Sequence, residues 1–182
     1  KVRYIMETSE KIKNARLKYL PEKISMLFIA EAPPAAVDRF FYYECVEKHD
    51  WLFLGIQKVF EPEKADIYLN SHRPPFLKKQ MLENFKRKGR FLLDLYPTAE
   101  IIKGLSLYVG NCIGTIEQYV AEGRMSKDTP IILIKSTVYD SLYYPLRNKG
   151  YNVIDERIPF PSSGQQKRFA ESFRRALKKC QS

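Results

Sequence analysis

The sequence predicts an α/β protein, a single three-layer α/β/α sandwich around a central, mainly parallel sheet of about four strands. Four short apolar segments are typical of strands buried on both faces, and they alternate with longer segments of helical apolar spacing. Buried strands that alternate with amphipathic helices indicate parallel βαβ units. The 182 residues contain no internal repeat, low-complexity segment or linker. We therefore expect one domain over residues 1–182.

The first part of the chain predicts two helices and one strand. Residues 1–21 mix charges with spaced apolar residues and end at a proline, which predicts an N-terminal helical extension. The run "ISMLFIA" (24–30) predicts the first buried strand, and "WLFLGIQKVF" (51–60) predicts a helix. Between them, "VDRFFYYECV" (37–46) holds four consecutive aromatic residues. We expect at least two of the four to pack inward.

Three further strands are predicted in the rest of the chain. They are "FLLDLYP" (91–97), "PIILIKST" (130–137) and a shorter one at "YNVID" (151–155). Residues 72–90 carry seven Lys or Arg against one acid and have helical apolar spacing. That pattern predicts an amphipathic helix with a basic face, which either contacts DNA or is an ordinary solvated face.

Helix starts are predicted from capping patterns. Thr115 with Gln118 and Ser163 with Gln166 fit capping boxes. Ser136 or Thr137 is expected to cap a third helix, which ends before Gly150. The helix after Ser163 repeats apolar residues every four positions, and these are core residues by their spacing: Phe169, Phe173 and Leu177.

The charge favours a polyanionic partner. The chain has 31 Lys and Arg against 21 Asp and Glu, a net charge of +10 and a pI of about 9.4. Nucleic acid is the first candidate partner and an acidic membrane surface the second. No apolar run approaches the ~20 residues of a membrane helix, and no apolar segment near the start resembles a secretion signal.

Cysteines and histidines argue against metal or redox chemistry. Cys45, Cys112 and Cys180 lie far apart and form neither a disulfide framework nor a zinc-ribbon pattern, so we expect a reducing, cytoplasmic setting. His49 and His72 have no ligand-type partner at helical spacing, and we expect both to be surface or structural residues. GxGxxG and GxxxxGK[ST] are absent, which disfavours dinucleotide-binding and P-loop enzymes. We expect no metal and no cofactor.

Acids and prolines follow two of the predicted strands. Glu31 precedes Pro33 and Pro34 after the first strand, and Asp94 comes at the end of the second. Ligands of parallel sheets bind beyond the carboxyl ends of the strands, where the loop 159–164 is also expected. This convergence predicts a site. The alternatives are that Glu31 is a solvated carboxylate and that Asp94 caps or bridges its strand end.

Three segments together resemble the signatures of the uracil-DNA glycosylase superfamily. "AEAPP" (30–34) is similar to the Gly-Glu-Ala-Pro-Gly stretch of its iron–sulfur branch, and "FLLDLYP" lies where that family has a strand ending in asparagine. "PFPSSG" (159–164), before a basic helix, resembles the family's His-Pro-Ser segment. The order and strand context of the three agree. The resemblance covers the chain from about Met26 to Leu177.

The resemblance implies an enzyme of DNA repair that flips a damaged base such as uracil and hydrolyses its N-glycosidic bond. Glu31 would be the catalytic acid, which stabilises the sugar cation or orients water and is held in place by the prolines. The expected partner is single- or double-stranded DNA, with no membrane, and the protein is expected to be a monomer. The implied base-binding residues are Ala32, Phe40, Phe41, Tyr42, Asp94 and Phe160. The implied DNA-binding residues are Pro161, Ser162, Ser163, Gln165, Lys167 and Arg168.

The chain departs from the family pattern at several positions. Phe160 replaces the histidine and offers no proton, and Asp94 replaces the asparagine and only accepts hydrogen bonds when ionised. Ala30 and Pro34 replace glycines, and the four cysteines of the iron–sulfur branch are absent, so we expect no cluster. The departures favour a different substrate or an alternative: a catalytically silent nucleic-acid-binding module. A small-molecule hydrolase or transferase is a third reading, which leaves the charge unexplained.

Overall fold

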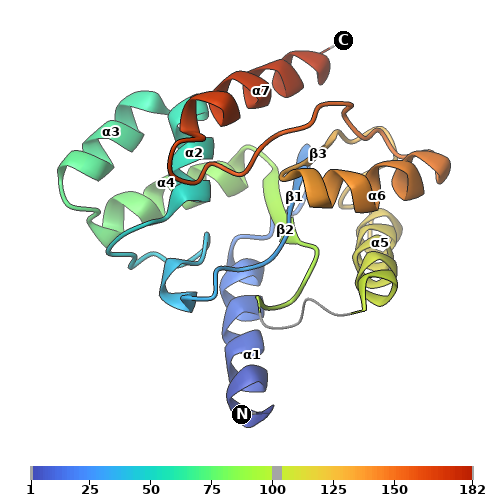
Figure 1. Cartoon of the computed structure of the whole chain (residues 1–182), viewed down its shortest axis with the longest axis horizontal. Helices are drawn as coiled ribbons and strands as arrows, with labels where there is room; N and C mark the ends of the chain where they lie inside the picture. The colour runs from blue at the N-terminus through green and yellow to red at the C-terminus, as the bar shows by residue number, and fades with distance from the viewer. Residues whose placement is uncertain (1, 100–103, 182) are drawn as a thin grey trace.

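The computed structural model describes residues 2–99 and 104–181, which form a mixed α/β fold with seven α-helices and a three-stranded parallel sheet (Figure 1). The sheet has the order β2-β1-β3. Its strands are β1 (Met26–Ala30), β2 (Arg90–Asp94) and β3 (Ile131–Leu133). The helices are α1 (Val2–Lys18), α2 (Trp51–Phe60), α3 (Pro62–Asn70), α4 (Pro75–Arg87), α5 (Leu105–Ala121), α6 (Ser136–Asn148) and α7 (Gln166–Lys179), with a 3₁₀ turn, η1 (Val37–Arg39).

The register of the sheet brings the ends of β1 and β2 together. Ala30 pairs with Asp94 at the carboxyl end, and Phe28 pairs with Leu92 on one side and with Ile132 on the other. Both neighbours of β1 are strands, and helices cover its faces, so all its residues after Met26 are buried. This explains why the first strand reads as an uninterrupted apolar run.

The sheet has three strands where the sequence predicted about four. The predicted strand at 151–155 contributes only one isolated parallel bridge, from Val153 to Ile131, and a second bridge, from Ile158 to Ile134, lies beyond its predicted end. Val153 and Ile158 are five residues apart, whereas their partners Ile131 and Ile134 are three residues apart. A regular β-ladder therefore cannot connect the two bridges. Pro159 then ends the segment, because it has no N–H to donate.

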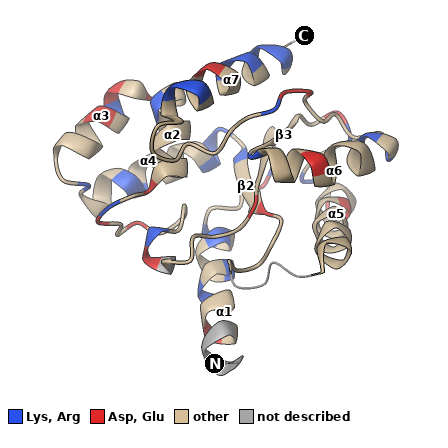
Figure 2. Ribbon diagram, in the orientation of Figure 1, with Lys and Arg blue, Asp and Glu red and all other residues tan. Residues whose placement is uncertain are grey.

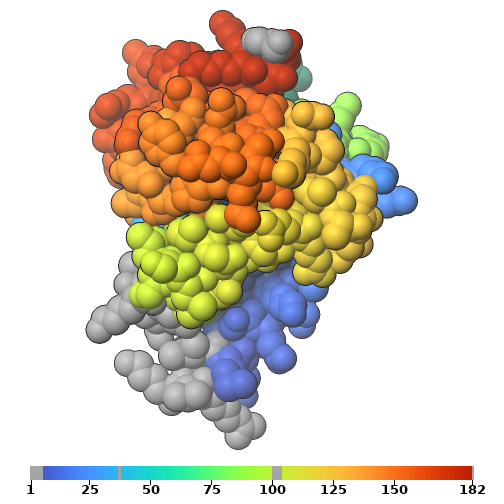
Figure 3. Space-filling view, turned by 90° about the vertical axis from the view of Figure 1, so that its right-hand side faces the viewer, coloured from blue at the N-terminus to red at the C-terminus, as the bar shows by residue number. Residues whose placement is uncertain are grey.

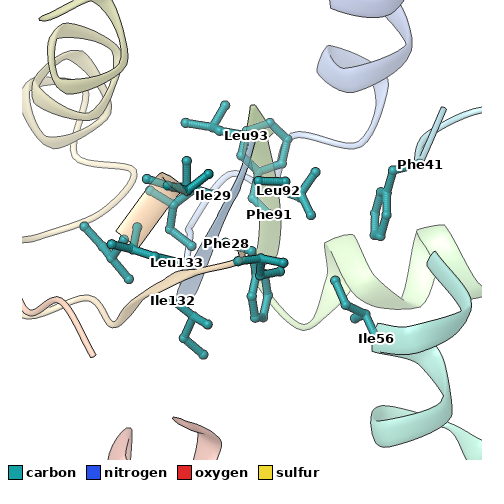
Figure 4. Packing of buried hydrophobic residues seen from close by; sticks show 14 of the residues in the cluster. Phe28, Ile29, Phe41, Ile56, Phe91, Leu92, Leu93, Ile132 and Leu133 are labelled. Carbon is teal, nitrogen blue, oxygen red and sulfur yellow. The ribbon is translucent and has the colours of Figure 1, made fainter. Parts of the chain in front are cut away.

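The helices form two groups around the strands. In Figure 1, α2, α3, α4 and α7 lie on one side of the sheet, and α5 and α6 lie on the other. Phe28 of β1 packs against Phe60, Phe85 and Phe173, which come from α2, α4 and α7. Figure 4 shows the strand residues of this core, with Phe41 and Ile56 beside them on the α2 side. Figure 3 shows the opposite group, where α5 and α6 form one continuous face.

All three predicted helix caps are wrong. α5 begins at Leu105, so Thr115 lies in its middle and donates its hydroxyl to the backbone oxygen of Asn111 at 3.0 Å. α7 begins at Gln166 with Gln165 as N-cap residue and without a side-chain capping bond, so Ser163 does not cap it. α6 begins at Ser136 with Lys135 as N-cap residue and without a side-chain capping bond, so neither Ser136 nor Thr137 caps it.

Within the described residues, no helix combines the length and the apolar character that crossing a membrane requires.

Candidate functional site

A cavity of about 240 Å³ lies beside the carboxyl ends of β1 and β2. Its walls come from four parts of the chain: the loop after β1, the start of α2, the end of β2 and the loop before α7. Most of the lining is apolar or aromatic, and four lining residues carry charged or titratable groups. The lining residues are Ala32, Pro33, Pro34, Arg39, Phe40, Phe41, His49, Asp50, Trp51, Leu52, Phe53, Leu92, Asp94 and Phe160.

The aromatic run after η1 is attached to the outer edge of β2. The hydroxyl of Tyr42 accepts a hydrogen bond from the Leu92 N–H at 2.7 Å and donates to the Leu92 oxygen at 3.0 Å. β2 is an edge strand, so its outward backbone groups need such partners when they are buried. Phe40 and Phe41 are thereby held against the cavity, and Phe41 also packs against Phe53 at 5.6 Å between ring centres.

The structure brings together five of the six residues predicted to bind a base. Ala32, Phe40, Phe41, Asp94 and Phe160 all line the cavity. Tyr42 does not: it lies in the core, 1% exposed, with its hydroxyl occupied by the backbone of β2. The acids and aromatics converge because the strand ends meet at one edge of a parallel sheet.

Asp94 forms an ion pair with α1. Its Oδ2 lies 2.5 Å from Nη2 of Arg16, and its side chain is 3% exposed. Burial raises the pKa of Asp94, and the adjacent guanidinium of Arg16 opposes that rise. Asp94 also lines a second cavity of about 270 Å³, on the α1 and α5 side. The carboxyl group therefore separates two cavities.

Asp50 is the second buried carboxylate in the lining. Its side chain is fully buried, and both oxygens are used: Oδ2 accepts from the Tyr68 hydroxyl at 3.0 Å and Oδ1 from Nε of Arg73 at 3.1 Å. Burial and the charge of Asp50 raise the pKa of Tyr68, so the phenol keeps its proton and donates. Asp50 therefore ties the start of α2 to α3 and to the loop before α4.

Lys78 lies directly behind the aromatic wall. Its ammonium nitrogen is 4.5 Å from the ring centre of Phe53 and makes only a long, 3.5 Å, contact with the Phe40 oxygen. The residue is 0% exposed. Burial lowers the pKa of Lys78 to about 7, and Asp50 counters part of that effect. The sequence suggested a uniformly basic helix face here, but α4 turns this lysine into the core.

Glu31, the predicted catalytic acid, is not among the residues that line the cavity. Its carboxylate forms an ion pair with Lys135 and accepts a hydrogen bond from the Thr137 hydroxyl at 2.8 Å. Lys135 follows β3 and has a φ of +84°, a strained value for a residue with a side chain. Its backbone N–H is held by the Ile158 oxygen at 2.8 Å. Glu31 thus has a fixed position immediately before Ala32, which does line the cavity.

The predicted DNA-binding residues lie on the loop before α7 and on its first turn. Ser163, Lys167 and Arg168 are exposed, and Ser162 and Gln165 are partly so. Pro161 is buried, because it packs on Gly55 of α2, where an added Cβ would lie 3.0 Å from both Pro161 and Phe169. The close approach at this glycine keeps Phe160 at the cavity.

Sequence reasoning missed the contributions of η1 and of the start of α2. Arg39 lines the cavity, and its Nε is buried without a hydrogen-bond partner among the described residues. His49, expected to be a surface or structural residue, is exposed and also lines the cavity; its ring lies 5.4 Å from that of Trp51. The sequence "HDW" (49–51), which clusters polar and aromatic residues at the predicted helix start, could have indicated that this segment lines the cavity.

Within residues 2–99 and 104–181, no group of three or more His, Cys, Asp or Glu side chains is placed to hold a metal ion. Comparisons of the chain with protein-family models, curated proteins and solved structures found no match. The resemblance to the uracil-DNA glycosylase superfamily therefore depends on the three sequence segments alone.

Proposed function

We propose that this protein is a DNA glycosylase-like enzyme on a three-layer α/β/α sandwich. It would flip a damaged base into the cavity and hydrolyse the base's N-glycosidic bond. The observation that carries the proposal is the meeting of Ala32, Phe40, Phe41, Asp94 and Phe160 in one cavity at the edge of the sheet. Enzymes that flip bases read the extruded base by stacking it between aromatic or apolar side chains and by hydrogen bonds to its edge.

The position of Glu31 is consistent with action on the sugar. In this proposal the base occupies the cavity while the sugar and phosphates stay outside it. Glu31 lies one residue before the lining and is fixed by Lys135 and Thr137. Hydrolysis joins the oxygen of water to C1′, breaks the C1′–N bond and leaves the electron pair and one proton on the base. A fixed carboxylate orients the water and stabilises the sugar cation.

The basic surface supports a DNA partner. Lys and Arg recur along α7 in Figure 2, beginning with Lys167 and Arg168 in its first turn. Free N–H groups and the dipole at a helix N-terminus favour anions such as phosphate. Arg175 and Lys179 are ion-paired with Glu156, so we assign the phosphate contacts to the N-terminal turn.

A second candidate function is base binding without turnover. The pairing of Glu31 with Lys135 offsets the carboxylate's charge, and Phe160 cannot donate a proton to a leaving base. These two observations favour a silent nucleic-acid-binding module on the same fold.

The test is base release from labelled oligonucleotides, single- and double-stranded, that carry uracil, hypoxanthine, xanthine or 8-oxoguanine. Heating in alkali reveals the abasic sites. We expect Glu31→Gln to lower release by about 10²- to 10³-fold while DNA affinity stays nearly unchanged. The control is Glu63→Gln, an exposed acid on α3. DNA binding with steep salt dependence but no release would favour the silent module. Absence of DNA binding would overturn both candidates.

A further inference from the structure

If a base occupies the cavity, the ionisation state of Asp94 determines which hydrogen-bonding edge of that base can face it. Arg16 is a permanent cation at 2.5 Å from Asp94, and its charge favours the ionised form of that carboxyl group against the burial that raises the group's pKa. An ionised carboxylate only accepts hydrogen bonds. Among the described residues, the hydrogen bond from Arg16 occupies Oδ2 and leaves Oδ1 for a ligand. Asp94 therefore faces the cavity as an acceptor.

Arg39 supplies the opposite kind of group. A guanidinium only donates hydrogen bonds, and this one lines the cavity with a buried Nε that has no partner among the described residues. Asp50 does not compete for a ligand, because Tyr68 and Arg73 already use both of its oxygens. The cavity thus combines a carboxylate acceptor with a guanidinium donor between aromatic walls.

The bases differ in how they fit this pair. Uracil places two carbonyl oxygens around one N–H, so a carboxylate that accepts from the N–H also meets carbonyl lone pairs. Adenine and cytosine place one amino group beside an unprotonated ring nitrogen, which again faces the carboxylate. Guanine places two N–H donors, at N1 and on the 2-amino group, beside the O6 acceptor. Arginine is the commonest partner of O6 and N7 of guanine.

We infer that this cavity selects a guanine-type edge, two adjacent N–H donors beside a carbonyl, over a uracil-type edge. The inference rests on the proposed function for the location of the base, and it names the substrate class. A lesion on the imidazole side of the ring, such as 8-oxoguanine, keeps this edge. The same edge is present in a free guanine-type base, so the experiment must distinguish a base in DNA from a free base.

The experiment has two arms, both read by titration calorimetry. The first titrates the whole chain with 9-methylguanine, 9-methylhypoxanthine, 9-methyladenine and 1-methyluracil. The second uses single-stranded oligonucleotides that differ in one central position: guanine, 8-oxoguanine, uracil or an abasic site. We expect a guanine-type preference of at least tenfold over uracil, and 9-methylhypoxanthine, which lacks the 2-amino donor, to bind more weakly than 9-methylguanine. Preference in the first arm alone identifies a free base as the ligand.

Variants test whether Asp94 causes the preference. Asp94→Asn replaces one acceptor oxygen with a donor, and we expect the ratio of guanine-type to uracil-type affinity to fall at least tenfold. Because Asn leaves Arg16 without its counter-charge, the double variant Arg16→Met with Asp94→Asn repeats the test without a stranded cation. Asp38→Asn, an exposed acid of η1 outside the cavity, is the matched control and should keep the wild-type ratio.

The outcomes separate this inference from the proposed function. Equal affinities, uracil preference, no binding in either arm, or a ratio unchanged in both Asp94 variants would each overturn the inference. Release of uracil without a guanine-type preference would overturn it and leave the glycosylase proposal standing. A guanine-type preference that depends on Asp94, with no base release from any oligonucleotide, would support it and refute turnover.

Discussion

The two buried carboxylates of the cavity, Asp50 and Asp94, differ in how far the protein satisfies them. Both oxygens of Asp50 accept hydrogen bonds, from a phenol and from a guanidinium, and a buried lysine lies nearby. Asp94 has one hydrogen-bond partner among the described residues, Arg16. A fully paired acid is a structural element, whereas an acid with an unused oxygen in a cavity wall is available to a ligand. The comparison therefore predicts that Asp50 contributes more to stability and that Asp94 is the better candidate for ligand contact.

The largest expected effect is at Asp50. Asp50→Ala leaves the partly buried Arg73 and the buried Lys78 without the negative charge of Asp50, and removing one partner of a buried pair typically costs about 3 to 5 kcal/mol. We expect the free energy of unfolding, measured in urea, to fall by about 4 kcal/mol. Asp38→Ala, on the exposed turn, should change it by less than about 0.5 kcal/mol. A loss below about 1 kcal/mol at Asp50 would contradict the structural role.

The next effect depends on pH and concerns Lys78. Its pKa in the folded protein is about 7, below the ordinary 10.5, so the unfolded chain binds more protons between these values. The free energy of unfolding should therefore rise with pH, by about 3 kcal/mol between pH 7 and 10. Lys78→Met should be more stable than wild type at pH 7 and should lack that rise. Urea unfolding at pH 6, 8 and 10 tests this, and parallel profiles for the two proteins would refute it.

A smaller effect is expected at Arg16. Arg16→Met removes the cation that opposes the rise in the pKa of Asp94, but the carboxyl group can respond by taking up a proton. We expect a loss of about 1 to 2 kcal/mol at pH 7, less than at Asp50, where Arg73 cannot release its proton. With the pKa of Asp94 raised in the folded variant, the folded state binds a proton that the unfolded chain does not bind. The loss in the free energy of unfolding should therefore shrink as the pH falls toward 4. A loss independent of pH would show that Asp94 stays ionised without Arg16.

The smallest effect on stability is expected at Glu31. Its ion pair with Lys135 is partly exposed, with side chains 22% and 40% accessible, and pairs of this kind contribute about 0 to 1 kcal/mol. Glu31→Gln should therefore keep the wild-type free energy of unfolding within about 1 kcal/mol. Thermal and urea unfolding of this variant check that any loss of base release is chemical. A larger destabilisation would place Glu31 with Asp50 as a structural acid.

The sequence predicted the elements that depend on local pattern. The predicted strands that begin at 24, 91 and 130 are confirmed as β1, β2 and β3, because both faces of each are buried. α3 was not predicted, and the predicted fourth strand forms a single isolated bridge at Val153, because the spacing to the next bridge at Ile158 does not match that along β3. Thr115 shows that a capping pattern does not predict a helix start where a helix already runs through it, whereas Ser163 lies in the turn before α7, whose N-cap residue is Gln165.

The site was predictable where it depends on topology. Asp94 and the loop with Phe160 were placed at one edge because parallel strands end together. Arg39, Asp50 and Lys78 were not predicted as a group, because their positions depend on how η1, α2 and α4 pack against one another. The helical spacing places Lys78, unlike Lys79, on the face of Met81, Leu82 and Phe85, but a lysine is rarely a core residue, so its burial was not predicted.

The ion pair between α1 and β2 also constrains how this protein can evolve. Aspartate and asparagine codons are related by a single-nucleotide change, so the carboxyl group can be lost in one mutational step. Arg16 and Asp94 lie 78 positions apart, and the order of their replacement matters. Losing Arg16 first leaves an acid that can be neutralised by a proton, whereas losing Asp94 first leaves a permanent, partly buried cation. Lineages that replace both residues should therefore have lost the arginine before the aspartate.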